Sequence, residues 1–300
     1  MSFDPDAAAV GGGLYGLPGS PAGARFVVLP VPFDATTSFR DGARHGPDVV
    51  LQASAQVDLF DVDFGRPWRH GIAMHEELAR RIRVWNREAR RLARPVIDAG
   101  GVVEGRPRLA GALARVNAIG GRVNSVVLEA ARSLLAAGKT PIVLGGDHST
   151  PFGALEAYGE VHPGLGILHV DAHADLRDAY EGFVWSHASI MHNVVHRIGP
   201  KGGIATLVQV GIRDLGERER DEIAASRRPG RTRIVTHFDA DLKSALFHGK
   251  SWAALAKAIV RALPKKVYVS IDIDGLDPML CPDTGTPVPG GLSFAGSCSS

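Results

Sequence analysis

Short apolar runs alternate with stretches of helical periodicity along most of the chain. The apolar runs are the candidate strands and lie at residues 25–32, 140–149, 164–173, 206–214, 233–239 and 266–275. Helical patterns lie at residues 46–60, 77–101, 122–139, 151–160, 187–198, 216–226 and 251–263, the second of which combines a basic helix with a following strand or turn. Continuously apolar strands separated by helices predict an α/β protein, with a parallel sheet covered by helices on both faces.

The domain organisation follows from the same pattern. Residues 1–24 are rich in Gly, Pro and Ala and predict an irregular lead-in. After them, neither a low-complexity linker nor an internal repeat divides the chain. We therefore expect residues 25–300 to form a single α/β domain.

Composition narrows the classes of function. The formal net charge is only +2 for 300 residues, and the densest basic stretch, residues 226–233, is typical of a solvated loop. A nucleic-acid or membrane-surface protein would usually show a concentrated basic patch. Two cysteines exclude a disulfide framework, and no apolar run reaches the roughly 18 residues of a membrane span. We expect a cytoplasmic protein without a signal peptide, a nucleic-acid partner or a membrane partner.

Candidate metal ligands collect where three of the predicted strands end. In parallel α/β sheets, ligands bind outside the carboxyl ends of the strands. The sequences "GGDHS", "DAHAD" and "DID" follow three such strands and supply Asp147, His148, Asp171, His173, Asp175, Asp272 and Asp274. Because side chains two positions apart on an extended chain share a face, the alternate residues within each motif can converge. Any one motif alone is also compatible with a polar turn; the three together predict a metal site.

The charges of this set indicate two ions rather than one. Four carboxylates would repel one another unless cations neutralised them, and two divalent cations balance the four charges of Asp171, Asp175, Asp272 and Asp274. Carboxylates with two imidazoles and no thiolate favour Mn²⁺, with Co²⁺, Ni²⁺ or Zn²⁺ as possible substitutes. A pair of ions about 3.5–4 Å apart can generate a hydroxide nucleophile at neutral pH, which is hydrolase chemistry.

The motifs also carry a family resemblance. The stretches "GGDHS", "DAHADLRDAYEG", "SHAS" and "SIDIDGLDPMLCPDTGTPVPGGLS" resemble the ureohydrolases, the arginase and agmatinase family, and the likeness runs from about residue 25 to 294. The resemblance implies a three-layer α/β/α sandwich around a parallel sheet and a binuclear Mn²⁺ centre. It also implies hydrolysis of a guanidino group to urea and an amine, by homotrimers or homohexamers.

The resemblance further implies roles for individual residues. One ion would be held by His148, Asp171, Asp175 and Asp272, and the other by Asp171, His173, Asp272 and Asp274. Asp175 would also orient the attacking hydroxide and accept its proton. His187, in "SHAS", would act as the general acid or proton shuttle for the leaving amine, because a histidine that titrates near neutrality suits that task. A surface histidine at a helix start is the alternative for His187.

The substrate is less closely defined. The segment from "DLRDAYEG" to "SHAS" looks more like agmatinases than arginases, and Gly216 stands where vertebrate-type arginases carry an extra acidic residue facing the substrate's α-amino group. This favours agmatine, which would yield putrescine, or 4-guanidinobutyrate. An arginase, or a guanidinobutyrase or another guanidino-acid hydrolase, is the alternative within the family.

The end of the sequence departs from the family pattern. The resemblance predicts a Glu four residues after Leu292 that grips the guanidinium, but Gly296 stands there and the chain ends in "AGSCSS". The family also has a further strand, inside the sheet, and a further helix at this point, and both are apparently missing. We therefore expect this chain to be weakly active, and a catalytically inactive metal-binding homologue is the alternative from a different class.

Overall fold

The computed structural model describes residues 3–7 and 12–294. These residues contain two parallel sheets, one in the order β2-β1-β3 and the other in the order β6-β5-β4-β7. The strands are β1 (Phe26–Val31), β2 (Ile72–Met74), β3 (Thr140–Gly145), β4 (Leu165–Val170), β5 (Ile204–Ile212), β6 (Arg233–Phe238) and β7 (Val267–Ile271). All the strand pairs within the two sheets are parallel, as the alternation of strands and helices predicts.

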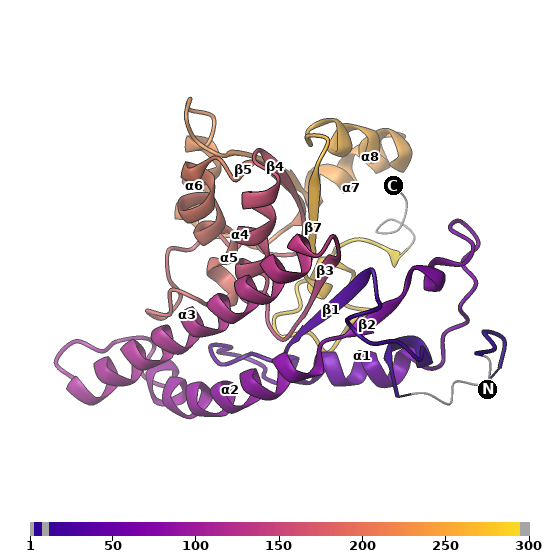
Figure 1. Cartoon of the computed structure of the whole chain (residues 1–300). Helices are drawn as coiled ribbons and strands as arrows, with labels where there is room; N and C mark the ends of the chain where they lie inside the picture. Colours follow the sequence, from indigo (N-terminus) through magenta and orange to yellow (C-terminus); the bar gives the residue numbers. More distant parts are fainter. Residues whose placement is uncertain (1–2, 8–11, 295–300) are drawn as a thin grey trace.

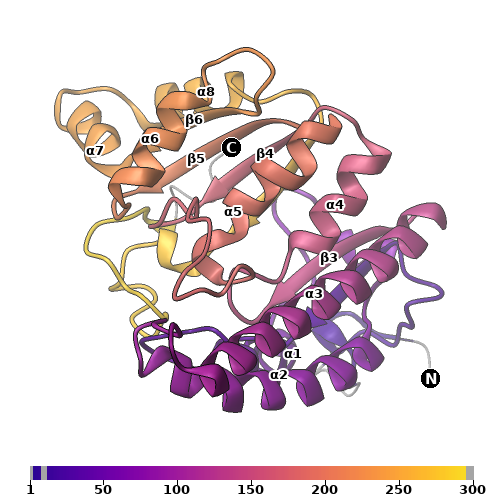
Figure 2. The ribbon, with the colours of Figure 1, turned by 90° about the vertical axis from the view of Figure 1, so that its left-hand side faces the viewer.

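Helices pack around both sheets (Figures 1 and 2). The α-helices are α1 (Gly46–Ser54), α2 (Glu76–Ile97), α3 (Pro107–Ala136), α4 (Phe152–Val161), α5 (Ile190–Asn193), α6 (Glu217–Ala225), α7 (Asp239–Phe247) and α8 (Trp252–Arg261). The long helices α2 and α3 lie against the three-stranded sheet, and their apolar side chains form one core cluster with those of β1. Burial of these apolar faces supplies the main driving force for this packing.

The four-stranded sheet buries apolar side chains on both of its faces. Leu165 and Ile167 of β4 pack with Leu155 of α4 on one face. Val170, from the opposite side of the same strand, packs with Leu242 of α7 on the other face. Alternation of side chains along a strand explains why a continuously apolar run is needed here. The arrangement is an α/β fold in which helices flank two parallel sheets.

Among the described residues, the parallel strands form two sheets rather than one. The strands β3 and β7 are edge strands, each paired on one side only within the two sheets. Apolar side chains are exposed there, with Val269 and Ile271 of β7 at 54% and 58% and Ile142 of β3 at 44%. No described segment pairs with either of these edges, which is why the sheet is divided. The prediction about the end of the sequence counts from Leu292, which is described, to Gly296. Gly296 and the rest of "AGSCSS" lie outside the described residues.

Several elements differ from the sequence prediction. Helix α3 begins at Pro107 rather than near residue 122, and neither the short strand β2 nor helix α7 was predicted. The predicted helix at residues 187–198 is irregular: a 3-10 turn (His187–Ser189), then α5, then a π-helical turn (Val194–Ile198). In the part of the chain that the structure describes, no helix combines the length and apolar character that crossing a membrane requires.

Candidate metal centre

The carboxyl ends of β3, β4 and β7 meet at one place. His148, which follows β3, has its Nδ1 atom 2.8 Å from Oδ2 of Asp171 and 3.2 Å from Oδ2 of Asp272. Its Nε2 atom lies 2.8 Å from Oγ of Ser270, a residue of β7. His148 therefore joins the three-stranded sheet to the four-stranded sheet at the point where the predicted ligands gather.

The segment after β4 supplies three of the predicted ligands. His173 forms an isolated parallel bridge with Asp214, so the chain is still extended there. The Nδ1 atom of His173 lies 3.1 Å from Oδ2 of Asp274 and 3.6 Å from Oδ1 of Asp171. The chain does not stay extended as far as Asp175, which has a φ of 55°, in the left-handed region that Asp tolerates better than most residues. Its Oδ2 atom nevertheless lies 3.4 Å from Nδ1 of His148.

Two sets of side chains offer ligand atoms that are close enough to hold an ion. Within the described residues, one set is His148, His169, Asp171 and Asp175, and the other is Asp171, His173 and Asp274. Asp171 belongs to both sets. Asp272 belongs to neither, although it lies beside His148, and its Oδ1 atom accepts a hydrogen bond from the backbone of Asp274. Oxygen and imidazole donors in two adjoining sets fit a pair of divalent cations.

The side chain of Arg213 holds the segment that carries Asp274. Arg213, directly after β5, donates from Nη2 to the carbonyl oxygens of Asp274 at 2.6 Å and Leu276 at 3.2 Å. The same nitrogen donates to the carbonyl of Val288 at 3.0 Å. Several hydrogen bonds from one planar cation hold this otherwise irregular chain in place.

The carboxylates of the cluster have opposed pKa shifts. Burial alone would raise the pKa of Asp171, but the nearby His169 and hydrogen bonds from His148, His169 and His173 hold it well below the ordinary value. Burial and the charge of Asp171 raise the pKa of Asp175 well above its usual range. Burial, with the charges of Asp272 and Asp171, raises the pKa of Asp274 to about 7. Without cations, therefore, the cluster cannot keep every carboxylate ionised at neutral pH.

The neighbouring aspartates raise the pKa values of two histidines of the cluster. Burial tends to lower the pKa of His173, but hydrogen bonds to Asp171 and Asp274 outweigh it and raise this pKa to about 11. Hydrogen bonds to Asp171 and Asp272 likewise raise the pKa of His148 well above its usual value, against the effect of burial. Protons on these imidazoles stand in for the positive charge that divalent ions would bring.

His187 lies at the start of the 3-10 turn that leads into α5. Its Nδ1 atom is buried and has no hydrogen-bond partner among the described residues. Burial lowers the pKa of His187 to about 4, although the charges of Asp272 and Asp171 act to raise it. The side chain is therefore neutral at pH 7 rather than titrating near neutrality, as the sequence reasoning assumed. By solvent exposure the residue as a whole is partly buried, at the start of a 3-10 turn.

Sequence reasoning missed His169, which is fully buried near the end of β4. Its Nε2 atom lies 2.8 Å from Oδ2 of Asp171. Two signals were present: His169 precedes Asp171 by two positions, so both share a face of the strand, and it interrupts an otherwise apolar run. Gln209, another buried polar residue within a strand, contacts His169 and shows the same second signal.

The loop around Gly216 is closed by a carboxylate. Glu219, in the first turn of α6, accepts hydrogen bonds from the backbone nitrogen of Gly216 at 2.7 Å and from that of Leu176 at 2.9 Å. The Glu219 side chain is buried and is used in these contacts. It ties α6 to the segment that follows "DAHAD".

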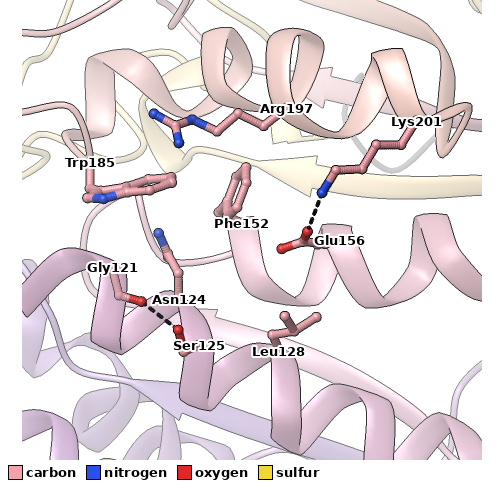
Figure 3. Close-up of a pocket in the computed structure, with 9 residues that line it drawn as sticks. All are labelled: Gly121, Asn124, Ser125, Leu128, Phe152, Glu156, Trp185, Arg197 and Lys201. Carbon is pink, nitrogen blue, oxygen red and sulfur yellow. Dashed lines mark hydrogen bonds and ion pairs between the residues drawn. The ribbon is translucent and has the colours of Figure 1, made fainter. Parts of the chain in front are cut away.

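A separate hollow of about 450 Å³ lies between α3, α4 and the π-helical turn, and contains none of the predicted site residues (Figure 3). Figure 3 shows Arg197 beside Trp185 and Lys201 pointing toward Glu156. The guanidinium carbon of Arg197 lies 4.5 Å from the centroid of the Trp185 ring. Trp185 lies two residues before His187, so this hollow adjoins the segment that carries His187 without forming part of the cluster.

Comparison with known proteins places the cluster in context. Residues 24–297 match the Arginase family. The chain belongs to the arginase family. It is a ureohydrolase, an enzyme that hydrolyses guanidino compounds, which are linear amidines.

Relatives of this ureohydrolase include the N(1)-aminopropylagmatine ureohydrolase of Thermus thermophilus, which is 36% identical over 90% of this chain and 74% of its own length. The agmatinase of Halalkalibacterium halodurans is 29% identical over 90% of this chain and 75% of its own length. The solved structure of the agmatine ureohydrolase of Thermoplasma volcanium has a TM-score of 0.64 and 23% identity, and covers 99% of this chain and 80% of that chain. At that level of identity the last comparison shows the fold alone.

Proposed function

We propose that this ureohydrolase hydrolyses agmatine to urea and putrescine with the help of two Mn²⁺ ions. The observation that carries the proposal is the pair of ligand sets that share Asp171 at the junction of the two sheets. When bound, two such ions would supply a hydroxide nucleophile at neutral pH and would stabilise developing negative charge. Co²⁺, Ni²⁺ or Zn²⁺ could replace Mn²⁺ in this donor set.

The residues would divide the two ions between them. In this proposal one ion is held by His148, Asp171, Asp175 and Asp272, and the other by Asp171, His173, Asp272 and Asp274. The position of Asp272 beside His148 supports its place in the first group. Asp171 and Asp272 would bridge the pair, and four carboxylates would balance the charge of two divalent ions.

Asp175 and His187 are the proposed proton carriers. The raised pKa of Asp175, caused by burial and the charge of Asp171, suits a carboxylate that accepts the proton of the attacking hydroxide. The neutral His187 has an unpartnered Nδ1 atom. It would take up a proton during the reaction and deliver it to the leaving amine, rather than begin the reaction already charged.

The substrate class rests on the loop around Gly216 and on the relatives. Glu219 is occupied by hydrogen bonds to the backbone of Gly216 and Leu176, so it is not free to hold an α-ammonium group. A substrate without an amino-acid head group fits better than arginine. The names of the relatives extend the choice from agmatine to N(1)-aminopropylagmatine, which carries the same guanidino group. Cytoplasmic homotrimers or homohexamers are part of the same proposal.

The test is a urea-release screen on metal-free protein supplied with Mn²⁺. The substrates are agmatine, N(1)-aminopropylagmatine, arginine and 4-guanidinobutyrate. We expect urea from agmatine or its aminopropyl derivative at a rate well above those for arginine and guanidinobutyrate. Asp171→Asn should abolish release, whereas Asp221→Asn, an exposed aspartate on α6, should leave it unchanged and is the matched control.

The departure at Gly296 calls for a second protein in the same screen. We expect slow turnover by this protein, because Gly296 offers no carboxylate for the guanidinium. A chimaera in which the residues after Leu292 are replaced by the corresponding segment of the Thermus relative should release urea faster. Absence of urea from all four compounds with both proteins would overturn the proposed hydrolysis, and a preference for arginine would overturn the substrate class.

A further inference from the structure

His169 offers two possible roles at the metal centre. It belongs to one of the two ligand sets, so its ring could bind an ion directly. It also lies 2.8 Å from Oδ2 of Asp171, so it could instead donate a hydrogen bond to that carboxylate. The choice depends on which ring nitrogen carries the proton and on whether the other nitrogen is free.

The orientation of the Gln209 amide decides this question. Nε2 of Gln209 lies 2.8 Å from the carbonyl oxygen of Ala174. A carbonyl only accepts hydrogen bonds, so the group that faces it must be the amide nitrogen and not the amide oxygen. The other end of the amide agrees, since Oε1 of Gln209 accepts a hydrogen bond from the Thr236 hydroxyl at 2.9 Å.

The fixed amide then determines the tautomer of His169. The same Nε2 atom of Gln209 lies 3.1 Å from Nδ1 of His169. Because this nitrogen of Gln209 is a donor, Nδ1 of His169 must accept, and the ring proton of the neutral histidine must lie on Nε2. That proton points at Oδ2 of Asp171. Both ring nitrogens are then engaged, and neither has a lone pair left for an ion.

We propose that His169 is a positioning residue, held by Gln209 in the Nε2–H tautomer, that orients the Asp171 carboxylate and does not bind metal itself. The inference rests on the proposed two-ion function. The hydrogen bond from His169 fixes one oxygen of Asp171, while the backbone nitrogen of His173 donates to the other at 2.7 Å. Both oxygens are thereby held between the two ligand sets. Hydrogen bonds of this kind to ligating groups typically change metal affinity about 10- to 100-fold.

The tautomer can be measured directly in the unaltered protein. With ¹⁵N-labelled histidine, the imidazole nitrogen shifts of His169 should show a protonated Nε2 and an unprotonated, hydrogen-bonded Nδ1 in the metal-free protein. Addition of diamagnetic Zn²⁺ should leave both nitrogens without the shift that metal coordination produces. A proton on Nδ1, or a coordination shift at either nitrogen, would overturn the proposal. This readout does not depend on any variant folding or on urea release.

Variants separate positioning from ligation by Mn²⁺ titration calorimetry. His169→Leu should keep two binding sites but weaken affinity by about 10- to 100-fold. His169→Gln, which places an amide nitrogen near the Nε2 position, should recover a large part of the loss. If His169 were a ligand, both variants would lose one of the two ions, which would contradict the proposal. Gln209→Met should also weaken affinity, whereas Thr236→Val, one step further from Asp171, should have the smaller effect.

The two proposals can fail separately. Absence of urea release, together with the predicted tautomer and the predicted affinity changes, would reject the hydrolase function and leave the role of His169 standing. Urea release with a coordinated His169 would do the reverse.

Discussion

Asp171 is the residue on which the centre depends. It is shared by both ligand sets and accepts hydrogen bonds from His169 and from the backbone of His173. The charge of His169 and the side-chain hydrogen bonds of His148, His169 and His173 outweigh the effect of burial and keep the carboxyl group ionised, with a pKa well below the ordinary value. A carboxylate that is already charged and oriented can receive two cations without first losing a proton.

His187 gives a pH-dependent prediction at the same scale. Burial lowers its pKa from 6.5 to about 4 in the folded protein. Its contribution to stability is therefore fully present above about pH 6.5 and is lost as the pH falls toward 4, since the unfolded chain binds the proton more readily. In metal-free protein, the stability loss between pH 7 and pH 5 should be about 1–2 kcal/mol smaller in His187→Gln than in the wild type. Urea denaturation at both pH values measures this difference.

A direct titration of the His187 imidazole can contradict this lowered pKa. The imidazole resonances of His187 should remain those of the neutral form down to about pH 5. A midpoint near 6.5 would show that the side chain is not buried as described, and would restore a role in which His187 begins the reaction protonated.

At the scale of residues, the sequence predicts the ligands better than their supports. The proposed ligands were recognisable because each follows an apolar strand and alternates along it, so Asp171 and His173 had to share a face. The partnership of His169 with Gln209 was not predictable in the same way. It joins β4 to β5 and depends on strand order and register, which a single sequence does not contain.

At the scale of elements, the close packing of α4 against α3 bears on the position of His148, the proposed ligand that follows β3. Gly153 in α4 lies so close to α3 that a Cβ atom there would come within 2.2 Å of the carbonyl oxygen of Asn124 and 2.7 Å of the nitrogen of Leu128. Only a residue without a side chain permits this approach. Helix α4 directly follows the "GGDHS" segment, so the crossing also bears on the position of His148.

Gly153→Ala should therefore destabilise the protein by about 1–3 kcal/mol, because the two backbones must move apart. Gly111→Ala is the matched control. Gly111 lies in α3, the helix that Gly153 approaches, and nothing lies within 4 Å of a Cβ atom added there. That substitution should stabilise the protein by up to about 1 kcal/mol, through higher helix propensity. Equal effects of the two substitutions on the free energy of unfolding would contradict the described crossing.

The sequence predicted the long, mostly apolar strands correctly, but not the short strand or the mixed helical segment. The strands β4 and β5 are largely buried, and their sequences are apolar except for a few polar residues such as His169 and Gln209. Strand β2 has three residues, too few for a period to be recognised. Residues 187–198 have helical periodicity, but the structure divides them among three kinds of helical turn, a choice made by tertiary packing rather than by local preference.

At the scale of the whole molecule, the metal centre is the junction of the two sheets. In the described residues the two sheets share no strand pairing, and β3 and β7 are each an edge strand of one sheet. The proposed ligands that follow β3, β4 and β7 meet across this division, where His148 contacts Asp171 and Asp272. The sequence pattern predicted the parallel strands, and the departure from the family pattern after Leu292 predicted that a strand inside the sheet is missing. Which strands lie at the open edges was not predictable, because strand order is set by the whole chain. Ions held in common by these residues would join the two halves of the fold.

The most direct test of the two-ion centre is electron paramagnetic resonance of the metal-free protein loaded with two equivalents of Mn²⁺. Two ions that share Asp171 should give the spectrum of a spin-coupled pair. Asp171→Asn should replace it with the signal of isolated or free Mn²⁺, and Asp221→Asn should preserve it. A wild-type protein that binds Mn²⁺ but shows only uncoupled ions would contradict the account.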